Sequence, residues 1–233
     1  GLRPQTLGIY DLGTNFRRSR PDAMTLPQVF KQHGWRTEAL GKIFHVGHGN
    51  TEDPASWSVP HWKANVVAYA LPASKAREGL TREEALFANK PAKDLPRGAV
   101  YEAADVPDNT YPDGALADEA IRRLQNVAES LRESAGRCGA TPPQKSKQKP
   151  TEPFFLAIGF VKPQKYWDFY DRAAFKLAEV RTPPAGAPGY APQFGGELRQ
   201  YSGIPESGPL NDELQRTLIH GYHAATSYMD AQL

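Results

Sequence analysis

The chain has 233 residues, of which 39% are hydrophobic and 23% charged, and its formal net charge is +2. That length suffices for one substantial domain with a hydrophobic core. The small net charge argues against a nucleic-acid partner, no apolar run is long enough to span a membrane, and the single cysteine excludes an internal disulfide.

A helix followed by a strand is predicted early in the chain. Thr25 can cap a helix that has Pro27 in its first turn, and Gly34 can end that helix in a left-handed conformation. A strand is then expected from about Arg36 to Gly41. This order is typical of an α/β sheet.

Further along, "PFFLAIGF" (153–160) is a continuous apolar run, as expected for a central parallel strand that is buried on both faces. Apolar residues at three- and four-residue spacing predict an amphipathic helix over 112–134. A flexible, basic insertion is expected at about 134–152. The remaining expectations are an extended piece at 7–12 and helices near 81–88, 165–175 and 211–232.

Lys42 and His45 follow the predicted strand 36–41, where open α/β sheets bind their ligands. An ammonium group and an imidazole together could bind an anion such as sulfate or phosphate. His45 and His48 could instead bind a metal, although no carboxylate or cysteine accompanies them at ligand spacing. From these residues alone, a solvated polar strand end is also possible.

Other residues give weaker signals. Cys138 lies in the predicted insertion, with no packed environment to activate it. His220 and His223 share a helix face and are expected to be ordinary helix histidines rather than metal ligands. Trp167 and Tyr170 are expected to pack on a helix face, with the alternative that they line a cleft.

Six stretches of the sequence resemble the sulfatase family, in particular its iduronate-2-sulfatase-like branch. They follow the family's order and touch most of the chain outside the predicted insertion and parts of the loops. The stretches are "GLRPQTLGIYDLGTNFR", "TLPQVFKQHGWRTEALGKIFHVGHGN", "DPASWSVPHW", "DVPDNTYPDGALADEAI", "PFFLAIGFVKP" and "GYHAATSYMDAQL".

The resemblance implies an alkaline-phosphatase-like α/β sandwich with a mostly parallel central sheet. Residues 1–233 would form part of its catalytic domain, incomplete at both ends. The implied activity is hydrolysis of sulfate esters on sulfated sugars, with a formylglycine nucleophile and Ca²⁺. The implied location is exported, either periplasmic or extracellular, or lysosomal in a eukaryote.

Lys42 and His45 match the lysine and histidine of the family's G-K-x-F-H element, which implies that they contact the sulfate or the substrate. Lys162 and Trp57 are weaker candidates for substrate binding. The chain shows no formylglycine motif and none of the family's calcium ligands, and Gln164 stands where relatives have a catalytic histidine. The expectation is therefore a chain that is inactive as given, or alternatively a non-catalytic sulfatase-derived module that binds sulfated glycan.

Overall fold

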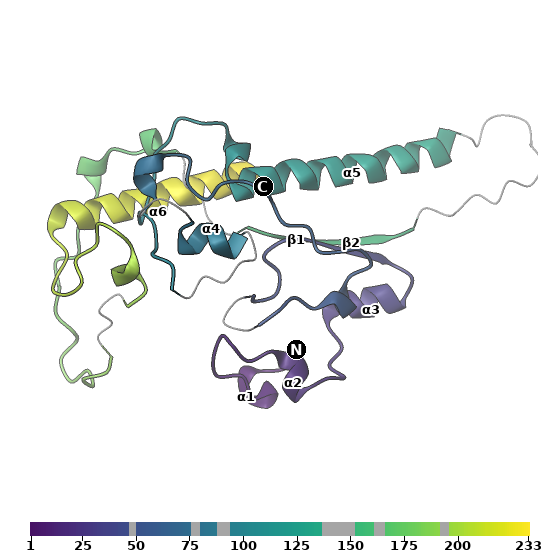
Figure 1. Cartoon of the computed structure of the whole chain (residues 1–233), viewed down its shortest axis with the longest axis horizontal. Helices are drawn as coiled ribbons and strands as arrows, with labels where there is room; N and C mark the ends of the chain where they lie inside the picture. The colour runs from purple at the N-terminus through teal and green to yellow at the C-terminus, as the bar shows by residue number, and fades with distance from the viewer. Residues whose placement is uncertain (47–49, 76–79, 88–93, 137–151, 161–165, 192–195) are drawn as a thin grey trace, which may run out of the picture. The chain divides into compact units, whose positions relative to one another are not determined.

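The computed structural model describes residues 1–46, 50–75, 80–87, 94–136, 152–160, 166–191 and 196–233 (Figure 1). Contacts divide the chain into two compact units. The first unit comprises Gly1–Ala64 and Leu116–Val161, and the second comprises Asn65–Ala115 and Lys162–Leu233. The α-helices and β-strands are α1 (Pro4–Leu7), α2 (Phe16–Ser19), α3 (Leu26–Gln32), β1 (Arg36–Gly41), α4 (Arg82–Phe87), α5 (Pro112–Gly136), β2 (Phe154–Gly159) and α6 (Asp212–Gln232).

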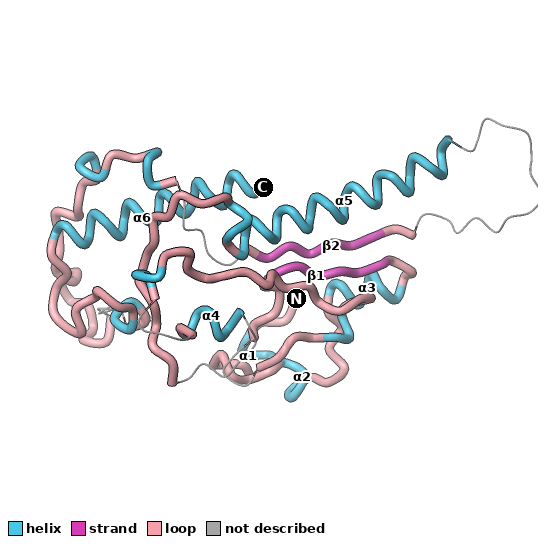
Figure 2. Tube along the Cα trace, turned by 45° about the horizontal axis from the view of Figure 1, so that its top comes forward, coloured by secondary structure: helices cyan, strands magenta, loops and turns pink. Residues whose placement is uncertain are grey.

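The first unit is built on two parallel strands, β1 and β2, which run side by side in Figure 2. Their register pairs Arg36 with Phe154 at one end and Gly41 with Gly159 at the other. Both strands and their parallel arrangement confirm the sequence prediction of an α/β fold. The prediction that 153–160 is buried on both faces was wrong, because the residues of β2 are half-buried and Ile158 is 39% exposed. The structure describes no further strand, so the larger central sheet and the sandwich remain predictions.

The other edge of β1 is covered by residues 58–62. Ser58 N donates to Thr37 O at 2.8 Å, and Trp62 N donates to Ala39 O at 3.0 Å. This segment satisfies backbone groups that would otherwise leave β1 with an open edge.

Helix α3 begins with a capping box, as its sequence predicts. The Thr25 hydroxyl accepts from Gln28 N at 3.3 Å, while the Gln28 side chain accepts from Thr25 N at 3.1 Å. The helix is followed by Gly34 at φ +79°. Phe30 then packs against both Trp35 and Phe155, with ring centroids 4.9 Å apart in each pair. These contacts fix α3 against the two strands.

The predicted amphipathic helix forms as α5, but only part of its apolar stripe is buried. Leu116 and Ala120 are 1% and 6% exposed and pack with Leu40 in the core of the first unit. Leu124 and Leu131, further along the stripe, are 44% and 50% exposed. The helix continues to Gly136. Residues 137–151 lie outside the described part of the chain, so the insertion expected at about 134–152 stays a prediction.

The extended piece predicted at 7–12 was wrong. Pro4 occupies the first turn of the short helix α1, and Gly8 ends this helix at φ +66°. A proline at the start and a left-handed glycine at the end favour one helical turn over a strand.

The helix predicted over 165–175 was also wrong. This stretch forms two separate 3₁₀ turns, Trp167–Phe169 and Arg172–Ala174. Tyr166 has φ +72°, and the Asp171 side chain accepts from Ala173 N at 2.9 Å. Tertiary packing of the aromatic side chains and this local aspartate cap override the helical spacing of the sequence.

In the second unit, α6 begins as predicted, with the Asn211 side chain accepting from Leu214 N at 2.8 Å. Its buried face includes His220, whose Nε2 lies 2.6 Å from Trp167 O. His220 is therefore a core histidine, as expected. Among the described residues, no helix is long and apolar enough to cross a membrane.

Candidate anion-binding site

Two glycines position Lys42 at the carboxyl ends of the paired strands. Gly41 has φ +74°, and a Cβ placed on it would lie 2.2 Å from Gly159 O. A Cβ on Gly159 would lie 2.0 Å from Lys42 O. This close approach lets Lys42 N donate to Gly159 O at 2.8 Å. The backbone of Lys42 is thus tied to the sheet, while its side chain is exposed.

His45 is half-buried and follows Lys42 by three residues. Between them, Phe44 packs against Phe16 and Trp57, with ring centroids 5.9 Å apart in both pairs. These aromatic contacts anchor the segment after β1, so its cationic and imidazole groups are carried by a packed turn.

Trp57, a candidate for substrate binding, is only 4% exposed. Its ring lies beside the rings of Phe44 and His61, with centroids 5.9 and 6.5 Å away. The structure therefore gives Trp57 a packing role under the strand end, and direct contact with a substrate remains a prediction.

A half-buried acid–imidazole pair links two neighbouring segments of this unit. His61 Nδ1 is 2.9 Å from a carboxylate oxygen of Glu52, and the two side chains are 6% and 16% exposed. The pair joins the residues after the strand-end turn to the segment that covers the edge of β1. It was not predicted from the sequence.

A salt bridge between Arg17 and Asp53 joins the N-terminal segment to the loop after β1. It was also not predicted from the sequence. Arg17 Nε and a terminal nitrogen of Arg17 donate to the two carboxylate oxygens of Asp53 at 2.9 and 2.8 Å. Burial alone would raise the pKa of Asp53, but the hydrogen bonds from Arg17 and Ser56 outweigh it, so the pKa lies below its ordinary value. The two residues are 36 positions apart in the sequence, so no local sequence pattern predicts that they pair.

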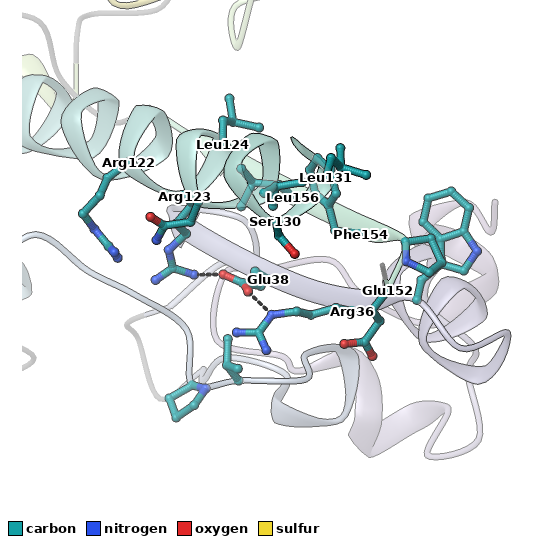
Figure 3. A pocket seen from close by; sticks show the side chains of 16 residues that line it. Arg36, Glu38, Arg122, Arg123, Leu124, Ser130, Leu131, Glu152, Phe154 and Leu156 are labelled. Atoms are coloured by element: carbon teal, nitrogen blue, oxygen red, sulfur yellow. Dashed lines mark hydrogen bonds and ion pairs between the residues drawn. The ribbon is translucent and has the colours of Figure 1, made fainter. Parts of the chain in front are cut away.

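A larger cavity of about 920 Å³ opens between α5 and the strands (Figure 3). More charged side chains line this cavity than surround Lys42 after β1, but its arginines pair with carboxylates. Glu38 bridges Arg36 and Arg123, while Arg122 and Arg123 both donate to Glu119. Hydrogen bonding from Arg122 is the largest of the causes that lower the pKa of Glu119 to about 2. The arginines that line this cavity are thus engaged by carboxylates.

Several predicted positions lie outside the described residues. They are Lys162, His48, Cys138 and Gln164. Within the part of the chain that the structure describes, no three His, Cys, Asp or Glu side chains are grouped so as to hold a metal ion. The described residues thus include no cluster of carboxylates that would supply the oxygen ligands that Ca²⁺ prefers.

Comparison with known proteins gives related sequences over the full length of the chain. Mouse and human iduronate 2-sulfatase are 28% and 29% identical to it, and each match covers the whole chain but 40% of the relative. A sulfatase of Formosa agariphila is 24% identical over the whole chain and 42% of its own length. The chain thus spans about two fifths of these relatives. No family model matches it.

Proposed function

Because the chain is related to the sulfatase family along its whole length, we propose that it forms part of the catalytic domain of a sulfuric ester hydrolase acting on sulfated sugars. The observation that carries this proposal is the glycine pair Gly41–Gly159, which holds Lys42 at the carboxyl ends of β1 and β2. Ligands of α/β sheets bind at this edge.

In this proposal, Lys42 neutralises a sulfate oxygen. Its ammonium group is a compact point charge on a flexible stem, and it is exposed to solvent. His45 supplies a second polar contact and can exchange a proton with the oxygen of the leaving alcohol. The packed Phe44 between them restricts the spread of positions that the two groups can occupy.

Two further contacts belong to the same proposal. Lys162 would add a second cation to the substrate site, although it lies outside the described residues. Trp57 would act indirectly, by packing against Phe44, because its own ring is buried. The Ca²⁺ and formylglycine of the family, and an exported or lysosomal location, are proposed from the relatives alone.

Binding of sulfate, separated from turnover, tests the proposal. Isothermal titration of the chain with a sulfated uronic-acid disaccharide and with its desulfated counterpart should show tighter binding of the sulfated form. Lys42→Ala should reduce that preference about tenfold, the value of one charge-assisted contact. Lys176→Ala removes the same charge from an exposed position in the second unit and should leave the preference unchanged.

Equal binding of the two disaccharides by the unmodified chain would contradict the proposal. Release of sulfate from the disaccharide by the chain would contradict the alternative of a non-catalytic glycan-binding module, whereas binding without release agrees with both.

A further inference from the structure

The second unit contains a cavity of about 290 Å³ with an aromatic lining. It is formed by three loop regions, the 3₁₀ turn at Trp167 and one face of α6. The lining residues are Tyr69, Ala99, Val100, Tyr101, Glu102, Trp167, Tyr201, Leu218, Gly221, Tyr222 and Ala225. Five of these eleven are tyrosine or tryptophan, whose large rigid rings bury area with little loss of side-chain entropy.

The inner rings are fixed by hydrogen bonds at their polar ends. The Tyr69 hydroxyl donates to Ala99 O at 2.9 Å, and Trp167 Nε1 donates to Glu102 O at 2.9 Å. Trp167 also lies against Tyr101, with ring centroids 5.0 Å apart. The side chains of Tyr69 and Trp167 are therefore already fixed without a ligand, so ligand binding needs little ordering of these residues.

A glycine on α6 lets the Trp167 ring lie directly against the helix. A Cβ on Gly221 would lie 2.8 Å from the Trp167 ring, so any larger residue would displace that ring. Next to it, Tyr222 is 75% exposed, and Tyr101 on the opposite loop is 40% exposed. These two tyrosines are the lining rings that are open to solvent and available to a ligand.

The lining offers little to attract a charged ligand. Among the described residues that line the cavity, the one charged residue is Glu102, which is 2% exposed. The Glu102 carboxylate accepts from Ala70 N at 2.8 Å, Leu71 N at 2.9 Å and the Tyr111 hydroxyl at 2.5 Å. In this part of the described chain no lysine or arginine lines the cavity to neutralise a sulfate or carboxylate, and the occupied Glu102 offers little attraction to a cation.

We propose that this cavity binds one neutral pyranose ring of an oligosaccharide, as a site separate from the sulfate contacts of the first unit. The weakly polarised C–H groups on a sugar face are attracted to the negative face of an aromatic ring, as ring edges are in T-shaped pairs. The sugar hydroxyls remain in water at the mouth beside Tyr101 and Tyr222. A volume of about 290 Å³ is at the small end for ligand pockets and suits one ring.

Neutral disaccharides test the site directly. Maltose, cellobiose and lactose are titrated into the chain up to about 20 mM, where weak sites are still populated, with saturation-transfer NMR and tryptophan fluorescence as readouts. We expect at least one to bind, with signal changes from Trp167. Tyr222→Ala should weaken binding about fivefold to tenfold through loss of one stacked ring. Ala225→Leu should abolish binding by filling the cavity.

Tyr190→Ala is the matched control, since Tyr190 is an 84% exposed tyrosine of the same unit and is not part of the lining. It should leave binding unchanged. Circular dichroism checks that each variant is folded. If Ala225→Leu does not fold, the result for Tyr222→Ala alone tests the proposed site. The proposal would be overturned if none of the three sugars binds or if Tyr222→Ala binds as tightly as the unmodified chain. It would also be overturned if Tyr190→Ala weakens binding as much as Tyr222→Ala does.

Separate variants distinguish failure of the proposed neutral-sugar site from failure of the proposed sulfate contacts. Lys42→Ala should leave neutral disaccharide binding unchanged, and Tyr222→Ala should leave the preference for sulfated over desulfated ligand unchanged. Neutral binding that disappears in Lys42→Ala would overturn the site proposed here.

Discussion

Gly41 and Gly159 lie so close at the paired ends of β1 and β2 that a Cβ on Gly41 would meet Gly159 O at 2.2 Å. This contact joins the sheet to the proposed chemistry, because the next residue, Lys42, bonds through its backbone to the same carbonyl. Any side chain at Gly41 must move one strand relative to the other.

Gly41→Ala should therefore destabilise the first unit and disturb the position of Lys42. The variant combines an unfavourable φ of +74° with a backbone clash, and the expected loss in the free energy of unfolding is about 3 kcal/mol or more. Gly34→Ala is the control, since Gly34 has φ +79° and a Cβ added to it would meet no atom within 4 Å. It should cost about 1 kcal/mol. Urea denaturation measures both, and equal losses would show that the close approach is unimportant.

The Arg17–Asp53 pair should make stability depend on pH. Asp53→Asn should lower the free energy of unfolding by about 3 kcal/mol at neutral pH, because Asp53 is 4% exposed and the Arg17 charge would lose its partner. The pKa of Asp53 is lowered in the folded state from its ordinary value of 3.8. The stabilisation is thus complete above that value and is lost as the pH falls through and below it.

The difference between wild type and Asp53→Asn should accordingly shrink on acidification. Asp212→Asn is the control, because Asp212 forms a surface pair with Arg181 in which both side chains are about half exposed. It should leave the midpoint of denaturation nearly unchanged. A difference for Asp53→Asn that stays constant from neutral pH to about pH 3 would contradict the assignment.

Glu102 should be the most sensitive polar residue of the second unit. Its carboxylate receives two backbone N–H groups and the Tyr111 hydroxyl. Glu102→Gln replaces one acceptor oxygen with a donor and should cost about 2 kcal/mol, whereas Tyr111→Phe removes one of the three bonds and should cost about 1 kcal/mol. Thermal unfolding compares them, and a larger effect of Tyr111→Phe would contradict this network.

Much of the local structure was predictable from the sequence. The strand at 36–41 lies between a capped helix and a glycine, and the strand starting at Phe154 is a continuous apolar run; both formed with nearly the predicted bounds. The cap at Thr25 and the start of α6 near residue 211 were also predictable from the sequence. These features depend on residues that are close together in the chain, so a local pattern suffices to predict them.

Features that depend on distant residues were not predictable. The partners in the pairs Arg17–Asp53 and Glu52–His61 come from different segments, and the aromatic cavity draws its rings from several. At 165–175 the helical spacing was misleading, because Trp167 is held by Glu102 O and by the face of His220. These tertiary contacts replace the helix with separate turns. By contrast, the alternative that Trp167 and Tyr170 line a cleft is confirmed for Trp167, while Tyr170 is not part of that lining.

Amide NMR of the chain during titration with a sulfated disaccharide tests the central claim most directly. We predict that the largest chemical-shift changes fall on residues 41–46 and on Gly159, that they are absent with the desulfated sugar, and that Lys42→Ala removes them. Sulfate-dependent shifts that are centred on Arg36, Arg122 and Arg123, or on any other surface while residues 41–46 stay unchanged, would contradict the placement of the sulfate at the ends of β1 and β2.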